Sequence, residues 1–159
     1  PKAIEKRVVN ISKFGVEIPV LAQAAATELS EDQLAKSMDL VKEVLKKLRQ
    51  KFINAKIEFL YLPSLGSSYQ FETIKVQTYQ GGKNLVSEEE NYSRSKLIRE
   101  KLKGHCDNVA GCGFCDPTEK IRSYTSSGVA VHGPRDWKHF NKKGYELVKS
   151  EYLKCFLSD

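Results

Sequence analysis

The sequence has no run of 18 or more apolar residues, so it predicts no membrane-spanning helix. Residues 1–7 also lack the apolar core that a secretory signal peptide needs. No internal repeat and no low-complexity linker occurs, so nothing marks a domain boundary. With 40% hydrophobic and 29% charged residues, the 159 residues are those of an ordinary globular protein with one core.

Metal-binding patterns are incomplete. A single C-x-x-C occupies residues 112–115, and neither a second one nor a pair of histidines accompanies it. Structural zinc takes four ligands, so His105 or Cys155 would have to complete the set with Cys106. Three interpretations stay open: a zinc knuckle, free thiols packed as small hydrophobes, or a disulfide of Cys106 with Cys112 or Cys115. We predict no metal and no cofactor.

Charge does not gather on one face. The net charge of +6 and a pI near 9.1 would suit an acidic partner such as nucleic acid. However, the basic residues of segments 31–51 and 88–103 are interleaved with, or follow, acidic ones, which indicates solvated helix faces. Residues 81–84, Gly-Gly-Lys-Asn, lack the spacing of a phosphate-binding P-loop. We therefore expect neither a nucleic acid nor a membrane as partner.

A long amphipathic helix is predicted from Ser30 to Phe52. Ser30 is a typical N-cap, and Gln33 three residues later completes a capping box. Apolar residues then recur at steps of three or four, which is one face of a helix. The stripe consists of Leu34, Met38, Val41, Leu45, Leu48 and Phe52, widened by Leu40 and Val44.

Helices and strands alternate after this point, which predicts an α/β domain. Residues 57–62 are nearly all apolar and suit a central strand covered on both faces, and the polar loop after it lies where open α/β sheets bind ligands. Further expected elements are a strand at 73–79, a helix from 87 through 102, a turn at 111–115, a helix or turn that begins at residues 116–118 and ends near 124, and a closing helix. That last helix has Tyr145, Val148, Tyr152, Cys155 and Phe156 on its core-facing side.

Near the end of the chain, Asp136 and His139 are three residues apart, after an apolar run and before an Asn and a Gly-Tyr. Side chains at i and i+3 on one turn project to the same side. A carboxylate placed there can orient an imidazole as a general base. The alternative for this spacing is a surface ion pair with Asp136 as a capping residue.

Residues 136–145 resemble the last sequence block of the SGNH (GDSL-type) hydrolases, in which D-x-x-H is followed by a short polar stretch, Gly-Tyr and a closing helix. With less specificity, the resemblance extends over residues 31–157. It implies an SGNH or flavodoxin-like three-layer sandwich with a mostly parallel sheet. It also implies that His139 is the general base and Asp136 its orienting acid in a Ser-His-Asp triad.

The resemblance stops short of the nucleophile. The chain contains no Gly-Asp-Ser block and no Gly-x-Asn-Asp block, which supply the serine and the oxyanion hole in that family. We therefore expect residues 1–159 to form a single α/β domain or the C-terminal portion of one, incomplete at its N-terminus. The serine would lie outside this chain, and the preceding segment of the same protein would be a partner.

The resulting hypothesis is a hydrolase of esters, for example acyl or acetyl groups on a carbohydrate or lipid, that is inactive as this isolated chain. Alternatives are a non-catalytic α/β interaction module and a zinc-knuckle binding protein. A local nucleophile is a weaker hypothesis, because Ser64, Ser67 and Ser68 precede the D-x-x-H without a G-x-S-x-G elbow. His132 is expected to be structural or pocket-lining, and Arg135 a solvated side chain.

Overall fold

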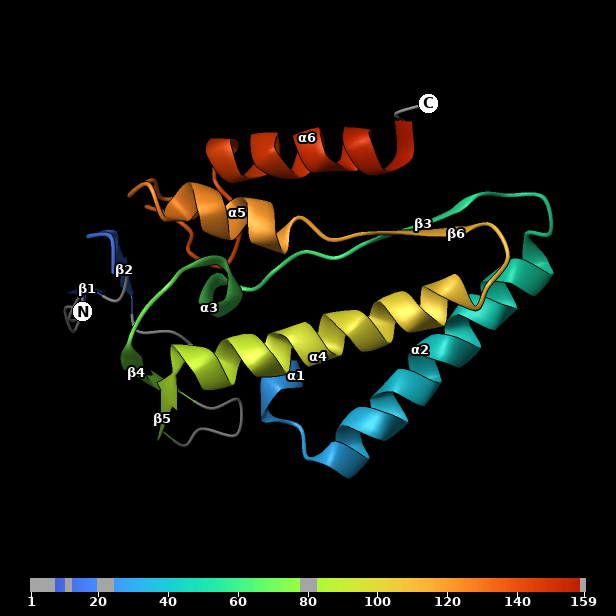
Figure 1. Ribbon diagram of the computed structural model, residues 1–159, viewed down its shortest axis with the longest axis horizontal. Coiled ribbons are helices and arrows are strands. Elements are labelled where there is room, and N and C mark those ends of the chain that lie inside the picture. The colour runs from blue at the N-terminus through green and yellow to red at the C-terminus, as the bar shows by residue number, and fades with distance from the viewer. Residues whose placement is uncertain (1–7, 11–12, 20–24, 78–82, 158–159) are drawn as a thin grey trace, which may run out of the picture.

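In a computed structural model, residues 8–10, 13–19, 25–77 and 83–157 of the chain are described, and they form an α/β fold (Figure 1). The helices are α1 Ala25–Glu28, α2 Glu31–Lys51, α3 Leu65–Ser68, α4 Glu88–Asp107, α5 Thr118–Thr125 and α6 Lys142–Leu157. The strands are β1 Val8–Asn10, β2 Glu17–Pro19, β3 Ile57–Leu60, β4 Thr73–Gln77, β5 Lys83–Ser87 and β6 Cys112–Cys115.

The described strands form three separate pairs. β3 and β6 are parallel, whereas β1 pairs with β2 and β4 with β5 in antiparallel fashion. A mostly parallel sheet was expected, and only the β3–β6 pair has that character. Figure 1 shows α6 on one side of this pair and both α4 and α2 on the other. None of the helices in the described ranges is both long and apolar enough to cross a membrane.

The capping box predicted for α2 is present. The Ser30 hydroxyl accepts a hydrogen bond from the Gln33 backbone N–H, and the Gln33 side chain accepts one from the Ser30 N–H. These bonds satisfy two of the donors that a helix start leaves unpaired. Leu34, Met38 and Leu45 are buried, but the outer part of the apolar stripe is exposed. The helix is therefore predicted correctly, while its apolar face is only partly covered.

Of the segment expected to be a turn, residues 111–115, Gly111 lies in a turn, but Cys112–Cys115 are instead strand β6. It pairs with β3 in register, with Ile57 opposite Cys112 and Leu60 opposite Cys115. The two glycines and the C-x-x-C spacing favour a turn locally. A partner more than 50 residues away overrides that preference. Gly113 is also needed for packing, because a Cβ there would lie 2.7 Å from the ring of Phe156 in α6.

β3 ends at Leu60, two residues before the predicted end, and it is not a central strand among the described residues. Among the strands that the structure describes, β6 is its one neighbour. Its one charged residue, Glu58, accepts a hydrogen bond from the Tyr152 hydroxyl of α6. This hydrogen bond lowers the pKa of Glu58. The apolar composition of β3 predicted a strand with neighbours on both sides, whereas the described residues provide a neighbour on one side.

The described residues form two apolar clusters. One lies between α2 and α4 and contains Leu34, Met38, Ile98 and Leu102, with Phe59 and Phe114 of the parallel pair packed against it. The second joins β5, α3 and its following loop to α5, α6 and the segment between them. Its buried members are Val16, Tyr69, Phe71, Val86, Ile121, Val131, Phe140 and Val148.

The remaining helices agree broadly with expectation. α4 and α5 cover the predicted helical segments, and β4 covers most of the strand expected at 73–79, whose last two residues lie outside the described ranges. In α6, Val148 and Phe156 are buried, but Tyr145 is 52% exposed and so does not face the core as predicted.

All four cysteines form disulfides. Cys106 of α4 is bonded to Cys112, and Cys115 is bonded to Cys155 of α6. The first pairing is one of those expected, whereas the second was not anticipated because Cys155 is 40 residues from its partner. Both ends of β6 are thereby linked covalently to a helix, one on each side of the strand pair.

Candidate functional site

The Asp136–His139 pair lies in the loop between α5 and α6. His139 Nδ1 is hydrogen-bonded to Asp136 Oδ2, and the other carboxylate oxygen accepts the backbone N–H of Lys138 at 2.8 Å. The hydrogen bond from His139, reinforced by the Lys138 N–H, lowers the pKa of Asp136. In the described part of the chain Nε2 of His139 makes no hydrogen bond, so the free nitrogen of the ring is available.

Both side chains are open to solvent: 68% of His139 and 55% of Asp136 is exposed. The pair is nevertheless positioned by a tight turn. The Gly133 N–H donates to the Asp136 carbonyl at 3.1 Å, and Gly133 has a φ of +69°, which favours glycine. A Cβ at that position would lie 2.6 Å from the Trp137 ring, so the turn leaves no space for a side chain.

Asn141 closes the loop behind the pair. Its side-chain N–H groups donate to the carbonyls of Ala130 and His132 at 3.0 and 3.1 Å. Its Oδ1 accepts the Gly144 N–H at 3.1 Å, which caps the start of α6. Gly144 must be glycine here, since a Cβ would lie 2.5 Å from the carbonyl oxygen of Val131. The Asn and Gly of the sequence motif thus have structural roles.

Tyr69, which follows α3, ties this loop to the segment after β3. Its buried hydroxyl accepts the backbone N–H groups of Val131 at 2.9 Å and His132 at 3.1 Å. Burial raises the pKa of this hydroxyl, and the two N–H donors offset part of that effect. Tyr69 therefore joins the segment after α3 to residues 131 and 132, which precede the D-x-x-H turn.

His132 is a structural residue, in line with expectation. It is 2% exposed, its Nδ1 lies 3.3 Å from the Tyr69 hydroxyl, and its ring stacks on Phe140 with centroids 4.5 Å apart. Burial lowers its pKa to about 4, although the charge of Asp136 acts in the opposite direction. The ring is therefore neutral at pH 7, and it packs between Tyr69 and Phe140 in the interior of the loop.

The serines after β3 do not reach the pair. Ser67 and Ser68 are buried. The Ser67 hydroxyl donates to Ser95 at 3.1 Å and lies 3.1 Å from the Ser64 hydroxyl, while the Ser68 hydroxyl donates to the Ser64 carbonyl at 2.8 Å. Within the described ranges none of these hydroxyls bonds to His139. The arrangement offers no local nucleophile.

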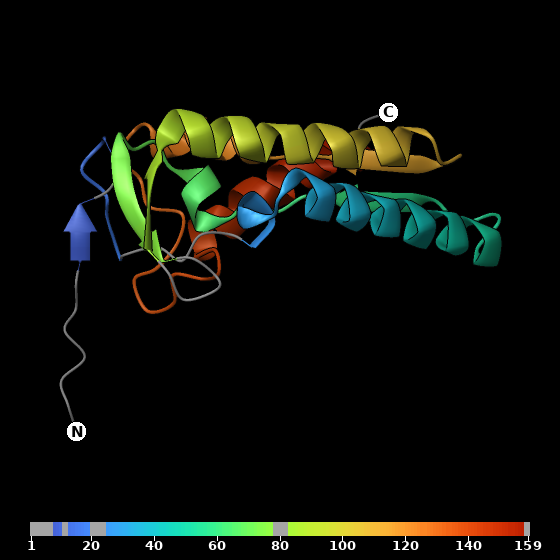
Figure 2. The same ribbon diagram turned by 90° about the horizontal axis from the view of Figure 1, so that it is seen from below.

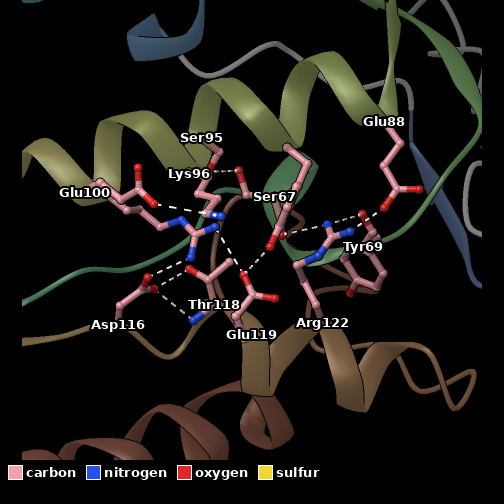
Figure 3. Close-up of polar contacts among 12 residues, drawn as sticks. Ser67, Tyr69, Glu88, Ser95, Lys96, Glu100, Asp116, Thr118, Glu119 and Arg122 are labelled. Atoms are coloured by element: carbon pink, nitrogen blue, oxygen red, sulfur yellow. Dashed lines mark hydrogen bonds and ion pairs between the residues drawn. The ribbon is translucent and has the colours of Figure 1, made fainter.

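A second polar cluster, which was not predicted from the sequence, lies at the carboxyl end of β6 (Figure 3). Arg99 of α4 is 7% exposed and pairs with Asp116 at 2.7 Å and Glu119 at 3.2 Å. Burial lowers the pKa of Arg99, but the hydrogen bonds and charges of the two carboxylates outweigh it and raise the pKa overall. Thr118 completes the cluster by donating its N–H to Asp116 at 3.0 Å.

Arg122 of α5 extends the cluster toward Tyr69. Its guanidinium pairs with Glu88 and donates to the carbonyls of Tyr69 at 3.1 Å and Ser67 at 3.3 Å (Figure 3). The ring of Tyr92 is close to both arginines: its centroid lies 4.6 Å from the guanidinium carbon of Arg122 and 5.7 Å from that of Arg99. These contacts fix α4, α5 and the segment around α3 to one another, while the buried Nε of Arg99 has no hydrogen-bond partner among the described residues.

An open groove of about 520 Å³ runs outside this cluster, between α4 and the end of β6. Lys96 and Lys103 line it, but each is paired along α4, with Glu100 at 3.9 Å and Asp107 at 2.5 Å. Across the described ranges, no group of three or more His, Cys, Asp or Glu side chains converges to hold a metal ion. The disulfides also consume the thiols that a zinc knuckle would need.

Comparison with known protein families, with curated proteins and with solved structures found no match to this chain.

Proposed function

We propose that this chain supplies the His139–Asp136 half of the active site of an SGNH-type ester hydrolase, with the serine supplied from outside the chain. The observation that supports it is the hydrogen bond from His139 Nδ1 to an Asp136 carboxylate that is itself held by a backbone N–H. Such a carboxylate selects the tautomer that leaves Nε2 unprotonated and able to act as a base.

The proposed reaction has two stages. His139 Nε2 accepts the proton of the serine hydroxyl as that oxygen attacks the ester carbonyl, and then passes the proton to the departing alcohol. In the second stage, the same nitrogen deprotonates a water molecule that attacks the acyl-serine, and the proton returns to the serine when the acid leaves. Asp136 stays ionised throughout, which agrees with its lowered pKa.

The proposal includes a finer description of the fold. β3 and β6 would be two strands of a mostly parallel sheet in a three-layer sandwich of the SGNH or flavodoxin type. The substrate would be an acyl or acetyl ester of a carbohydrate or lipid. The exposure of both residues supports access for a substrate that is itself bulky, because the pair does not lie at the bottom of a cavity.

The decisive measurement is labelling of the full-length gene product with a fluorophosphonate probe, followed by hydrolysis of p-nitrophenyl acetate. We expect labelling of a serine upstream of residue 1. His139→Gln should lower kcat by about 10⁶-fold and Asp136→Asn by about 10⁴-fold. The matched controls are His105→Gln and Glu146→Gln. Turnover that is unaffected by His139→Gln would refute the proposal.

The chain by itself gives a second test. The 159 residues should not hydrolyse p-nitrophenyl acetate, because none of the described Ser64, Ser67 and Ser68 hydroxyls is hydrogen-bonded to the pair. Activity that disappears in Ser67→Ala would show instead that a local serine acts. Imidazole ¹⁵N shifts at pH 8 should show His139 with Nδ1 protonated, and Asp136→Asn should convert it to a mixture of tautomers.

A non-catalytic interaction module is the alternative, and the solvent exposure of the pair also favours it. An exposed ion pair at the start of a helix needs no catalytic explanation. The two candidates differ in one result, since the module predicts that the full-length product carries no serine that reacts with fluorophosphonate.

A further inference from the structure

Positive charge is concentrated in residues 135–143, which we call the basic segment. The segment contains four basic residues, Arg135, Lys138, Lys142 and Lys143, and one acidic residue, Asp136. Four positive charges and one negative charge leave +3, which is half of the net charge of +6 of the whole chain. The basic segment is therefore an exception to the mixed charge of α2 and α4.

The four cations have no acidic partner within the described ranges. All four side chains are exposed, and none of them makes an ion pair there. The one carboxylate of the segment, Asp136, is bonded to His139 and accepts the Lys138 backbone N–H. The described part of the chain thus leaves the charge of the basic segment available to an external anion.

Backbone contacts hold the basic segment in one shape. His132 and Phe140 pair as an isolated antiparallel bridge, which closes the loop between them. Asn141 donates to the carbonyls of Ala130 and His132 at 3.0 and 3.1 Å, and it thereby attaches the start of α6, with its two lysines, to the base of this loop. Figure 2 shows the loop, in orange-red, projecting from the side of the molecule opposite α4. A charged surface that is already ordered loses less conformational entropy when it binds.

The start of α6 differs in charge from the starts of the two other long helices. The first turns of α2 and α4 are acidic, whereas α6 has no acidic residue in its first turn and begins with Lys142 and Lys143. The positive end of a helix dipole favours anions, so two lysines there disfavour the folded helix. Residues that oppose the local physics of the fold commonly mark a functional surface.

The apolar side chains of the basic segment are directed inward. Trp137 and Phe140 pack in the apolar cluster around Tyr69. Binding to a membrane surface takes exposed apolar side chains beside the cations, because these enter the boundary between headgroups and acyl chains. The segment presents cations without such apolar residues, which favours a polyanion in water over an anionic membrane.

The proposed hydrolase also requires that the ligand carry an ester within reach of His139. Nucleic acids are polyanions without acyl esters, whereas the hydroxyls of an anionic polysaccharide can be acylated. Among polyanions in water, a polysaccharide therefore satisfies both the charge of the basic segment and the chemistry of the Asp136–His139 pair.

We propose that the basic segment binds an anionic polysaccharide, and that its four cations contact sulfate or carboxylate groups on either side of the ester that lies at His139. The ester rests on the proposed function, since it presupposes the hydrolase. Binding of the polyanion itself needs no serine.

Titration of the 159-residue chain tests the binding. The probes are fluorescein-labelled dextran sulfate and polygalacturonate, with uncharged dextran as control. We expect at least one of the polyanions to bind, with an affinity that falls at least about 10-fold between 50 and 200 mM NaCl, because bound counterions are released. The tighter of the two identifies the anionic group. Equal affinity for dextran, or no binding to either polyanion at 50 mM NaCl, would overturn the proposal.

A matched pair of variants tests the location. Each variant replaces four exposed cations by glutamine, so the two have the same net charge. The first carries Arg135→Gln, Lys138→Gln, Lys142→Gln and Lys143→Gln. The control carries Lys36→Gln, Lys42→Gln, Lys47→Gln and Lys101→Gln, on α2 and α4.

The first variant should bind the polyanion about 30-fold more weakly, because it loses four surface contacts that act together. The control should lose less than about 3-fold, which is the effect of net charge alone. The melting temperature of the first variant should not fall, because its lysines do not stabilise the start of α6. Equal losses of affinity in the two variants would reject the basic segment as the binding site.

Two further probes decide the class of partner. Tighter binding to a single-stranded oligothymidylate, or to phosphatidylserine vesicles, than to either polysaccharide would assign the basic segment to a nucleic acid or a membrane and would refute the proposal. Esterase activity is not a readout of these titrations. A full-length product without a reactive serine would refute the hydrolase, whereas equal binding by the two variants would refute the present proposal, so the two failures are distinguishable.

Discussion

The hydroxyl of Tyr69 accepts a hydrogen bond from the backbone N–H of His132, across 63 residues of sequence. It accepts a second one from Val131, so a single side chain satisfies two buried donors. Tyr69 directly follows α3, and His132 precedes the turn that carries Asp136. The position of the Asp–His pair therefore depends on a residue outside the D-x-x-H motif.

Removal of that hydroxyl should loosen the loop. Tyr69→Phe leaves the Val131 and His132 N–H groups buried without an acceptor, which we expect to lower the free energy of unfolding by about 1–3 kcal/mol. Urea denaturation at pH 7.5 measures the loss. Tyr145→Phe is the control, because Tyr145 is 52% exposed. A similar loss in both variants would show that the hydroxyl of Tyr69 has no special role.

His132 should make stability depend on pH between about 6.5 and 4. Its folded-state pKa of about 4 lies below the ordinary value of 6.5, so the unfolded chain binds the proton more tightly. The stabilisation is complete above pH 6.5 and is lost as the pH falls toward 4. Linkage gives a loss of about 2 kcal/mol between pH 7.5 and pH 5.

Urea denaturation at the two pH values checks the expected loss. His132→Gln should remove most of the pH dependence, whereas His105→Gln should retain it. A wild-type free energy of unfolding that stays constant from pH 7.5 to pH 5 would mean that the ring is protonated without cost in the folded protein.

Arg99 should contribute more to the stability of the fold than the neighbouring Lys96. Arg99→Leu leaves the partly buried Asp116 without its partner, and breaking such a pair costs about 3 kcal/mol. Lys96→Leu, one turn away on α4, removes only an exposed pair of 3.9 Å and should cost less than about 0.5 kcal/mol. Thermal denaturation of both variants decides it, and equal melting temperatures would contradict a structural role for the cluster.

The two disulfides should contribute unequally. Cys115–Cys155 spans 40 residues and Cys106–Cys112 only six, so the first restricts the unfolded chain more. Chain-entropy estimates give about 4 and about 2.2 kcal/mol. Double Cys→Ala variants compared by urea denaturation without reductant test the order. A larger loss for the 106–112 pair would show that strain or residual structure decides instead.

Features that depend on contacts between residues close in sequence were predicted correctly. The start of α2 was correct because Ser30 and Gln33 cap it through contacts three residues apart. β6 was missed because four residues rich in glycine and cysteine resemble a turn until β3 pairs with them. No pattern within ten residues carries that information.

The polar cluster was missed for a similar reason. Arg99 lies in the segment 88–103, whose charged residues were expected to face solvent. Asp116 follows residues 111–115, which were expected to form a turn. Their contact requires α4 and the end of β6 to lie side by side. The pairing of Cys115 with Cys155 also depends on where α6 lies, so cysteine spacing alone pointed only to Cys106 and its near neighbours.

The Cys115–Cys155 bond closes a covalent ring that contains the whole Asp136–His139 loop. Lys138 in that loop is exposed and is a site where trypsin can cut. A single cut there opens the ring without releasing a fragment, because both new ends stay attached through the disulfide. The nicked protein would run as one species on a non-reducing gel and as two after reduction. Damage to the exposed loop thus leaves α6 tethered to β6.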